Sequence, residues 1–180
     1  MKSILQSIKP QYCKLIASGK KTIEVRKTRP KLEIPFKVYI YRTKDELLTK
    51  SHNNGAIYLS ENKYKSALEK AGNLTLSGKV IGEYICDKIT EYEYMNQGFN
   101  FWSYNVSTYE LALMGLSYED FSTYGQGSTL YGWHISDLIM YDEPKELSEF
   151  MASCKDNDCG FKQLVHPPQS WCYVEENNRL

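Results

Sequence analysis

The sequence has 180 residues, 42% of them hydrophobic, and a formal net charge of zero. A chain of this length is expected to form one domain, residues 1–180, that buries about 70% of its unfolded surface without help from a disulfide or a metal. It has no apolar run of about eighteen residues, and Lys2 and Lys9 leave too short an apolar stretch between them for a signal peptide. We therefore expect a cytoplasmic protein with no membrane partner.

Residues 10–26 predict a short helix, a glycine stop and a charged strand. Pro10 suits the first helical position, where its missing N–H would be unpaired anyway. Gly19 is expected to adopt the left-handed conformation that ends a helix. Residues 22–26, T-I-E-V-R, alternate in polarity, which places three polar side chains on one face of a strand: Thr22, Glu24 and Arg26.

Four residues of this stretch have the form G-x-K-x-x-E-x-R: Gly19, Lys21, Glu24 and Arg26. The pattern, placed between a helix and a strand, resembles the signature of the activating signal cointegrator homology (ASCH) domain, a relative of the PUA RNA-binding fold. Residues 78–84, 133–147 and 167–174 resemble the middle and closing strands of ASCH proteins of bacteria and their phages. The resemblance implies an α+β fold, a small mixed or antiparallel PUA-like β-barrel with flanking helices.

Charge is distributed unevenly along the chain. Residues 1–50 contain thirteen Lys and Arg against four Asp and Glu, whereas residues 51–180 contain nine against eighteen. Because steering depends on the local potential rather than on net charge, this distribution favours a basic face that attracts phosphates. The alternative is that folding mixes the two segments and cancels the field.

Residues 34–42 alternate as a half-buried strand, which we expect beside the charged strand. In that arrangement Tyr39 and Tyr41 would lie next to Glu24 and Arg26, and aromatic rings beside cations suit single-stranded nucleic acid. The alternative is that tyrosine is simply a good strand residue. The predicted RNA-binding or ligand-binding residues are Gly19, Arg26, Tyr39, Tyr41 and Arg42.

Lys21 and Glu24 are the candidate catalytic residues. A partly desolvated lysine can act as a base or nucleophile, and a neighbouring carboxylate can act as acid, base or orienter. The resemblance implies three precedents: ASCH proteins that bind RNA, ribonucleases, and amidohydrolases that remove the acetyl group from acetylcytidine with a lysine and a threonine of this segment. Lys21 matches that lysine, but Glu24 stands where the threonine stands.

Three functions follow from these observations. The first is an RNA-binding or nucleotide-binding module whose cleft beside the barrel is lined by Lys21, Glu24, Arg26 and nearby tyrosines. The second is a hydrolase on a modified nucleoside or a ribonuclease. The third is an interaction protein whose charged face meets an acidic partner. None of the three requires a cofactor.

The remaining elements are predicted from local signals. Ser107 with Glu110 forms a capping box, and Ser117 with Asp120 starts a second helix. Residues 78–90, 130–141 and 170–174 predict strands, the last closing the barrel, while residues 92–102 predict a loop and residues 144–150 a short helix. His134 and Glu83 are most simply structural, Glu83 in a salt bridge with a lysine.

The five cysteines are an odd number and are expected to be reduced. Four residues near the C-terminus have zinc-ligand chemistry: Cys154, Cys159, His166 and Cys172. The spacing of the first pair is at the upper limit for zinc sites, and the alternative is a polar loop with incidental cysteines. We therefore predict no metal site.

Overall fold

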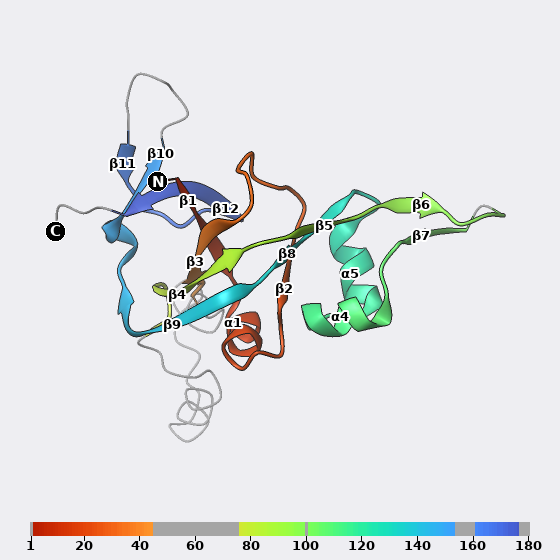
Figure 1. Cartoon of the computed structure of the whole chain (residues 1–180), viewed down its shortest axis with the longest axis horizontal. Helices are drawn as coiled ribbons and strands as arrows, with labels where there is room; N and C mark the ends of the chain where they lie inside the picture. Colours follow the sequence, from red (N-terminus) through yellow and green to blue (C-terminus); the bar gives the residue numbers. More distant parts are fainter. Residues whose placement is uncertain (1, 45–75, 100, 154–160, 177–180) are drawn as a thin grey trace, which may run out of the picture. The chain divides into compact units, whose positions relative to one another are not determined.

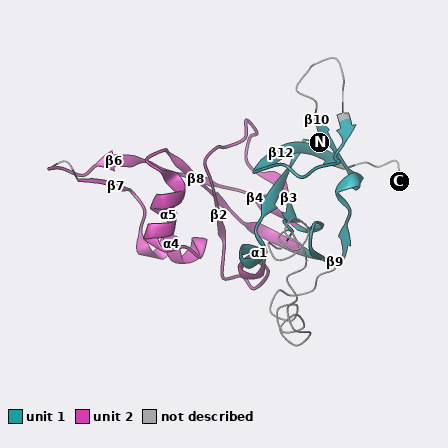
Figure 2. Ribbon diagram, turned by 180° about the vertical axis from the view of Figure 1, so that it is seen from behind, with its two compact units in different colours: residues 1–13, 39–82, 140–180 teal, residues 14–38, 83–139 magenta. Residues whose placement is uncertain are grey.

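The computed structural model describes residues 2–44, 76–99, 101–153 and 161–176. The chain forms two compact units (Figure 2). Unit 1 consists of residues 1–13, 39–82 and 140–180, and unit 2 of residues 14–38 and 83–139. Four elements pass from one unit into the other: α1 (Pro10–Ala17), β3 (Phe36–Arg42), β4 (Val80–Cys86) and β9 (Ser136–Lys145).

Unit 1 pairs the two ends of the chain (Figure 1). The N-terminal strand β1 (Ser3–Ile8) runs antiparallel to β12 (Trp171–Glu176), and β12 also pairs with β10 (Phe150–Ser153), which pairs with β11 (Phe161–Gln163). The sheet has the order β11-β10-β12-β1-β3-β4-β9. The buried core of unit 1 contains Leu5, Tyr39, Tyr41, Val80, Phe150 and Val174.

Unit 2 is built on a three-stranded antiparallel sheet with the order β2-β8-β5. Its strands are β2 (Ile23–Arg26), β8 (Leu130–His134) and β5 (Ile89–Tyr92). The helices α4 (Thr108–Met114) and α5 (Tyr118–Gly125) supply the other side of its core. That core contains Ile23, Val25, Tyr92, Tyr104, Leu111, Met114, Phe121 and Leu130.

The predicted helix signals are confirmed. Gly19 follows α1 with a φ of 70°, in the left-handed region. Ser107 and Glu110 form the complete capping box of α4, and the Ser117 side chain accepts a hydrogen bond from the Asp120 N–H at the start of α5. These boundaries were predictable because each depends on residues within one turn.

Three element predictions are wrong. Residues 78–90 form two strands, β4 and β5, separated by the exposed residues Asp87 and Lys88. Residues 92–102 contain most of a hairpin of β6 (Tyr94–Asn96) and β7 (Trp102–Tyr104) rather than a loop. In place of a helix at 144–150, β9 continues through Pro144 and only a 3-10 turn, η2 (Leu147–Glu149), follows. Proline is tolerated there because β9 is an edge strand.

The predicted neighbour of the charged strand is also wrong. β2 pairs with β8, which lies more than a hundred residues later in the sequence, whereas β3 lies between β1 and β4. The α+β class is confirmed. The described strands form open sheets rather than a closed barrel, because the largest sheet ends at β11 on one side and at β9 on the other. The expectation of a single domain stays a prediction. In the described part of the chain, no helix has the length and apolar character needed to cross a membrane.

A substitution at Gly125 would test the packing of unit 2. A Cβ at this position would overlap the hydroxyl of Tyr104, which is buried and donates a hydrogen bond to the Ser128 carbonyl. We expect Gly125→Ala to lower the free energy of unfolding by about 1–3 kcal/mol, although alanine is the better helix former. Urea unfolding measures the change, and Thr123→Ala on the exposed face of α5 is the control. Equal stability of Gly125→Ala and wild type would contradict this packing.

Candidate functional site

The turn after α1 places Lys21 at the C-terminal end of helix α4. The backbone N–H groups of Lys20 and Lys21 both donate to the Leu15 carbonyl, which closes the turn at Gly19. The Lys21 ammonium then donates to the carbonyl oxygen of Met114, the last residue of α4, over 2.6 Å. Since the carbonyl end of a helix carries partial negative charge, this position stabilises a cation.

Glu24 joins Lys21 and Arg26 into one cluster, which we call the charged triad. Glu24 Oε2 lies 3.2 Å from Lys21 Nζ, and Glu24 Oε1 lies 3.0 Å from a guanidinium nitrogen of Arg26. Their side chains are only 2%, 8% and 9% exposed for Lys21, Glu24 and Arg26. The ion pair expected from the sequence therefore exists, and it is buried rather than exposed.

Burial changes how much the triad contributes to the free energy of folding. An exposed ion pair contributes about 0–1 kcal/mol, whereas removing one partner of a buried pair costs about 3–5 kcal/mol because it leaves an uncompensated charge. The triad carries two cations and one carboxylate, so its formal net charge is +1. The Glu24 carboxylate contacts both buried cations and compensates their charge.

Exposed groups adjoin the triad. Tyr124 of α5 is 39% exposed, and the Lys27 ammonium lies 5.3 Å from the centre of its ring. Burial raises the pKa of Tyr124, while the charge of Arg26 opposes that rise and the charge of Glu24 adds to it, which places the phenol within electrostatic reach of the triad. We name Lys27, Arg29 and Lys31, which are all exposed, the basic loop.

The other predicted ligand residues have different surroundings. Gly19 is exposed, with open space around its α-carbon. Tyr39, Tyr41 and Arg42 belong to unit 1 and are each 3% exposed, Tyr39 packing edge-on against Phe150. Their proximity to Glu24 and Arg26, and their role in binding, stay predictions.

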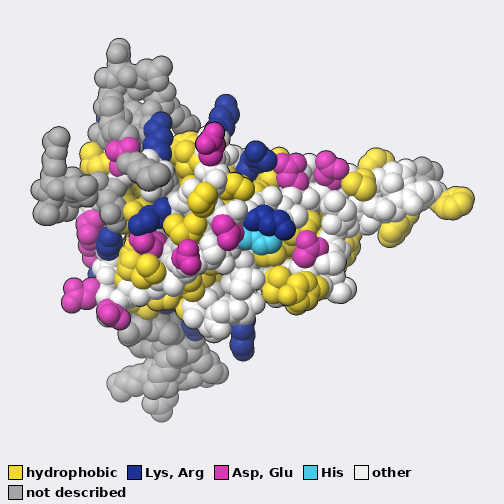
Figure 3. Space-filling view, in the orientation of Figure 1, with side chains coloured by type: hydrophobic (Ala, Val, Ile, Leu, Met, Phe, Trp, Pro, Cys, Tyr) yellow, Lys and Arg dark blue, Asp and Glu magenta, His cyan; other side chains and the backbone are white. Residues whose placement is uncertain are grey.

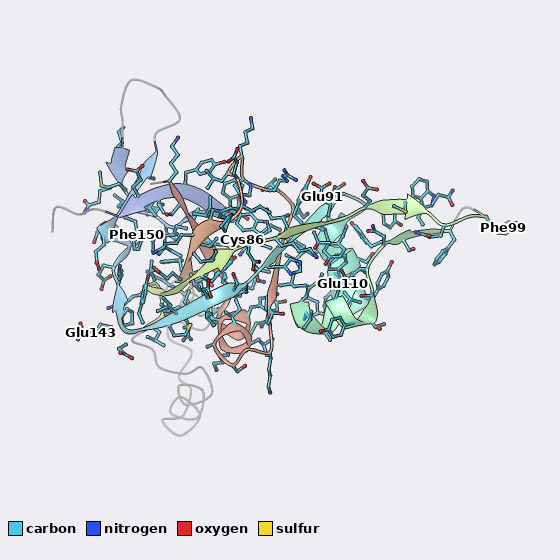
Figure 4. All side chains as sticks on the ribbon, viewed as in Figure 1. Cys86, Glu91, Phe99, Glu110, Glu143 and Phe150 are labelled. Atoms are coloured by element: carbon cyan, nitrogen blue, oxygen red, sulfur yellow. The ribbon has the colours of Figure 1, made fainter. Side chains whose placement is uncertain are left out.

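A second polar cluster, which the sequence analysis missed, connects β5, β8 and α4. His134 Nε2 and Thr90 Oγ1 are 2.8 Å apart, and the Tyr92 hydroxyl donates to Glu110 Oε1 over 3.0 Å. The Thr90 and Tyr92 side chains are also hydrogen-bonded, which completes a chain from His134 to Glu110. Glu110 is labelled in Figure 4 at the start of α4. The only sequence signal was the spacing of Thr90 and Tyr92 on one strand face.

Both ends of this polar chain have shifted pKa values. Burial, with help from the Lys88 charge, lowers the pKa of His134, although Asp87 and Glu110 oppose the shift. Burial acts to raise the pKa of Glu110, but the hydrogen bonds from Ser107 and from the Tyr92 hydroxyl outweigh it and hold that pKa below its ordinary value. A neutral imidazole and an ionised carboxylate are therefore the stable pair near neutral pH.

The described cysteines show no metal chemistry. Cys13, Cys86 and Cys172 are free thiols, and burial raises the pKa of Cys86 to about 12 and that of Cys172 to about 11. Such thiols stay protonated and unreactive. Within the described residues no three His, Cys, Asp or Glu side chains come together as metal ligands. Cys154 and Cys159, which the zinc alternative needs, lie outside the described residues.

The His134 environment predicts a pH dependence of stability. The folded pKa lies below the ordinary value of about 6.5, so the unfolded chain binds the proton more readily and stability falls as the pH drops from about 7 to about 5. Urea unfolding across this range should show a shallower fall in His134→Gln than in wild type. His166→Gln, at an exposed position, is the control and should behave as wild type. Equal slopes in wild type and His134→Gln would refute the prediction.

Comparison with known proteins identifies the family. A model of the ASCH domain matches residues 7–149, which include the charged triad and the second polar cluster. The fold is similar to the crystal structure of ASCH from Zymomonas mobilis, with 18% sequence identity, a TM-score of 0.56 and coverage of 96% of this chain and 87% of that chain.

Two substituted forms of the Zymomonas mobilis protein are also similar. They have TM-scores of 0.54 and 0.52 at 18% identity, and the alignments cover 98% and 97% of this chain and 93% and 89% of theirs. No curated protein matches the chain. Since the family model spans well over half of the sequence and the fold agrees, this chain belongs to the ASCH domain family.

Proposed function

We propose that this ASCH domain binds RNA or a nucleotide-like ligand at the surface formed by the basic loop and Tyr124, backed by the charged triad. The family is PUA-like and often binds RNA. The observation that carries the proposal is the exposed pair of Lys27 and Tyr124, which lies within electrostatic reach of the buried Arg26 and Glu24.

The chemistry of this surface suits a single-stranded nucleic acid. Phosphates are attracted by closely spaced exposed cations, and Lys27, Arg29 and Lys31 recur at every second residue. Arg29 lies 2.8 Å from Glu91, but both side chains are about half exposed, so the pair contributes little and can exchange for a phosphate. The exposed ring of Tyr124 offers a face on which a base can stack.

The triad serves this surface as a support. Glu24 forms ion pairs with both Arg26 and Lys21. The charge of Arg26 in turn acts on the Tyr124 phenol. The Arg26 and Glu24 side chains are only 9% and 8% exposed and bonded to each other, so they support the surface from beneath rather than form most of the contact with a ligand. Gly19 contributes the turn that sets Lys21 in place.

Salt dependence distinguishes binding through phosphates from other modes. We expect wild type to bind a fluorescent single-stranded RNA with an affinity that falls steeply with salt. Lys27→Ala should weaken binding roughly 3- to 10-fold and reduce the slope of log K against log[salt] by about 0.7, because one phosphate contact is lost. Fluorescence anisotropy measures both quantities.

Matched variants locate the surface. Tyr124→Leu should weaken binding without changing the salt slope, since it removes stacking and no charge. Lys14→Ala, an exposed lysine of α1 outside the basic loop, is the control and should retain wild-type affinity. The proposal fails if Lys14→Ala and Lys27→Ala have the same effect, or if wild type binds no RNA.

One observation supports the hydrolase alternative. Lys21 and Glu24 form a buried amine and carboxylate pair 3.2 Å apart, an arrangement that can pass a proton. The Lys21 ammonium is, however, also bonded to the Met114 carbonyl, which suits a fixed cation better than a nucleophile. This geometry favours binding as the main function.

Turnover assays decide between the two functions. We expect wild type to leave RNA uncleaved and to release no acetate from acetylcytidine. If turnover is observed, Lys21→Arg should abolish it while keeping the buried charge and the fold, as judged by circular dichroism, and Lys20→Ala at an exposed position should not. Turnover lost only in Lys21→Arg would establish the hydrolase function instead.

A further inference from the structure

The hairpin of β6 and β7 presents aromatic side chains to solvent. We call residues 94–104 the aromatic arm, of which residue 100 lies outside the described residues. Phe99 is fully exposed, Phe101 is 64% exposed and Trp102 is 51% exposed. Figure 4 labels Phe99 at the tip, directed away from the rest of unit 2. Three neighbouring exposed rings form a patch of the kind that usually marks an interaction site.

The aromatic arm is anchored rather than loose. The Tyr94 ring stacks on Trp102 at 5.8 Å and packs on Tyr104 at 5.0 Å, and Tyr104 packs against the buried Phe121 at 5.2 Å. The Tyr104 hydroxyl also donates to the Ser128 carbonyl. A continuous series of rings thus connects the exposed patch to the core of unit 2.

The tip has a defined backbone. The Gln97 N–H donates to the Phe101 carbonyl over 2.7 Å, and the Phe101 N–H donates to the Gly98 carbonyl over 2.9 Å. Phe99 has a φ of 48°, a left-handed conformation that non-glycine residues rarely adopt. A tight turn therefore holds an apolar ring outward at a backbone cost, which suits a contact residue.

The aromatic arm itself has no charge, which disfavours phosphate-rich partners. Residues 94–104 contain no charged residue, and residues 89–144 contain no Lys or Arg. The same 89–144 segment contains eight carboxylates: Glu91, Glu93, Glu110, Glu119, Asp120, Asp137, Asp142 and Glu143. RNA and anionic membranes bind through cations, and the arm itself supplies none, which disfavours both as its partner. Figure 3 shows hydrophobic side chains gathered over the hairpin, with no Lys or Arg among them on this face.

The same features favour self-association. Two neutral arms meet without charge repulsion, which is not true of two charged patches. β6 and β7 form a two-stranded sheet, and no other described strand pairs with either of them. The Tyr104 N–H of β7 donates to the Tyr118 hydroxyl, so β6 offers the freer edge, and the arm has no lysine or proline to block edge pairing. An isolated two-stranded sheet is also marginal by itself and gains from added strands.

We propose that the aromatic arm is a self-association site through which two copies of this chain pair arm to arm about a two-fold axis. Each exposed ring can bury roughly 100–200 Å², so two arms together bury about 600–1,200 Å², at the low end for specific interfaces. The expected dimer is therefore weak and depends on protein concentration. This proposal is independent of the proposed RNA binding.

Sedimentation velocity of the whole chain tests it. From about 1 µM to about 500 µM, wild type should shift from monomer to dimer with a Kd on the order of 10–100 µM. Phe99→Ser and Phe101→Ser should each raise the Kd at least tenfold, because they remove rings from the contact. Tyr109→Ser, at a 71% exposed aromatic of α4 outside the arm, is the control and should leave the Kd unchanged.

Each other outcome overturns the proposal. A wild type that stays monomeric over the whole range rules out the dimer, and an equal effect of Tyr109→Ser assigns it to a different surface. If Phe99→Ser instead weakens RNA binding as much as Lys27→Ala does, the arm belongs to the RNA surface. A blue shift of tryptophan fluorescence with neutral lipid vesicles, lost in Phe99→Ser, would assign the arm to lipid.

Discussion

The buried carboxylate of Glu24 is the constraint on which unit 2 depends. Lys21 and Arg26 are both buried, and the Glu24 carboxylate between them compensates the cost of burying their charges. The ammonium of Lys21 also satisfies the carbonyl end of α4, so one residue holds a turn, a strand and a helix together. Because Glu24 lies opposite Trp133 in the β2-β8 register, a slip by one residue would turn these charges toward the apolar core.

Charge is separated on unit 2 in a way that suggests two uses. The cations follow the triad in the basic loop, next to the ring of Tyr124. The aromatic arm, residues 94–104, contains no charged residue. A cationic surface attracts phosphates and a neutral aromatic one does not, so the two proposed surfaces would suit different kinds of partner. The zero net charge of the chain conceals this division.

Local signals explain what the sequence predicted. The end of α1 at Gly19 and the capping box of Ser107 and Glu110 need only residues within one turn, and the salt bridge expected for Glu83 is formed with Lys37 at 2.7 Å. The family signature identified the triad because its members lie within eight positions of each other.

The features that could not be predicted from the sequence depend on contacts between residues far apart in the chain. The bond from Lys21 to Met114 spans 93 positions, and the hydrogen bond between Thr90 and His134 depends on which strands pair. Sequential strands are often neighbours, and that assumption failed for β2, whose partner comes from the far end of unit 2. The hairpin was missed because its stability comes from ring stacking rather than from an alternating pattern.

The pairing of β1 with β12 has a consequence for biosynthesis. Ser3 finds its partner Val174 only after the long segment between them has left the ribosome. Until then β1 lacks its pairing with β12, and an unpaired strand edge is open to misassembly while the segment between the two strands is synthesised. Pairing between strands so far apart in the sequence also slows folding, since a long loop must close before the strands can pair.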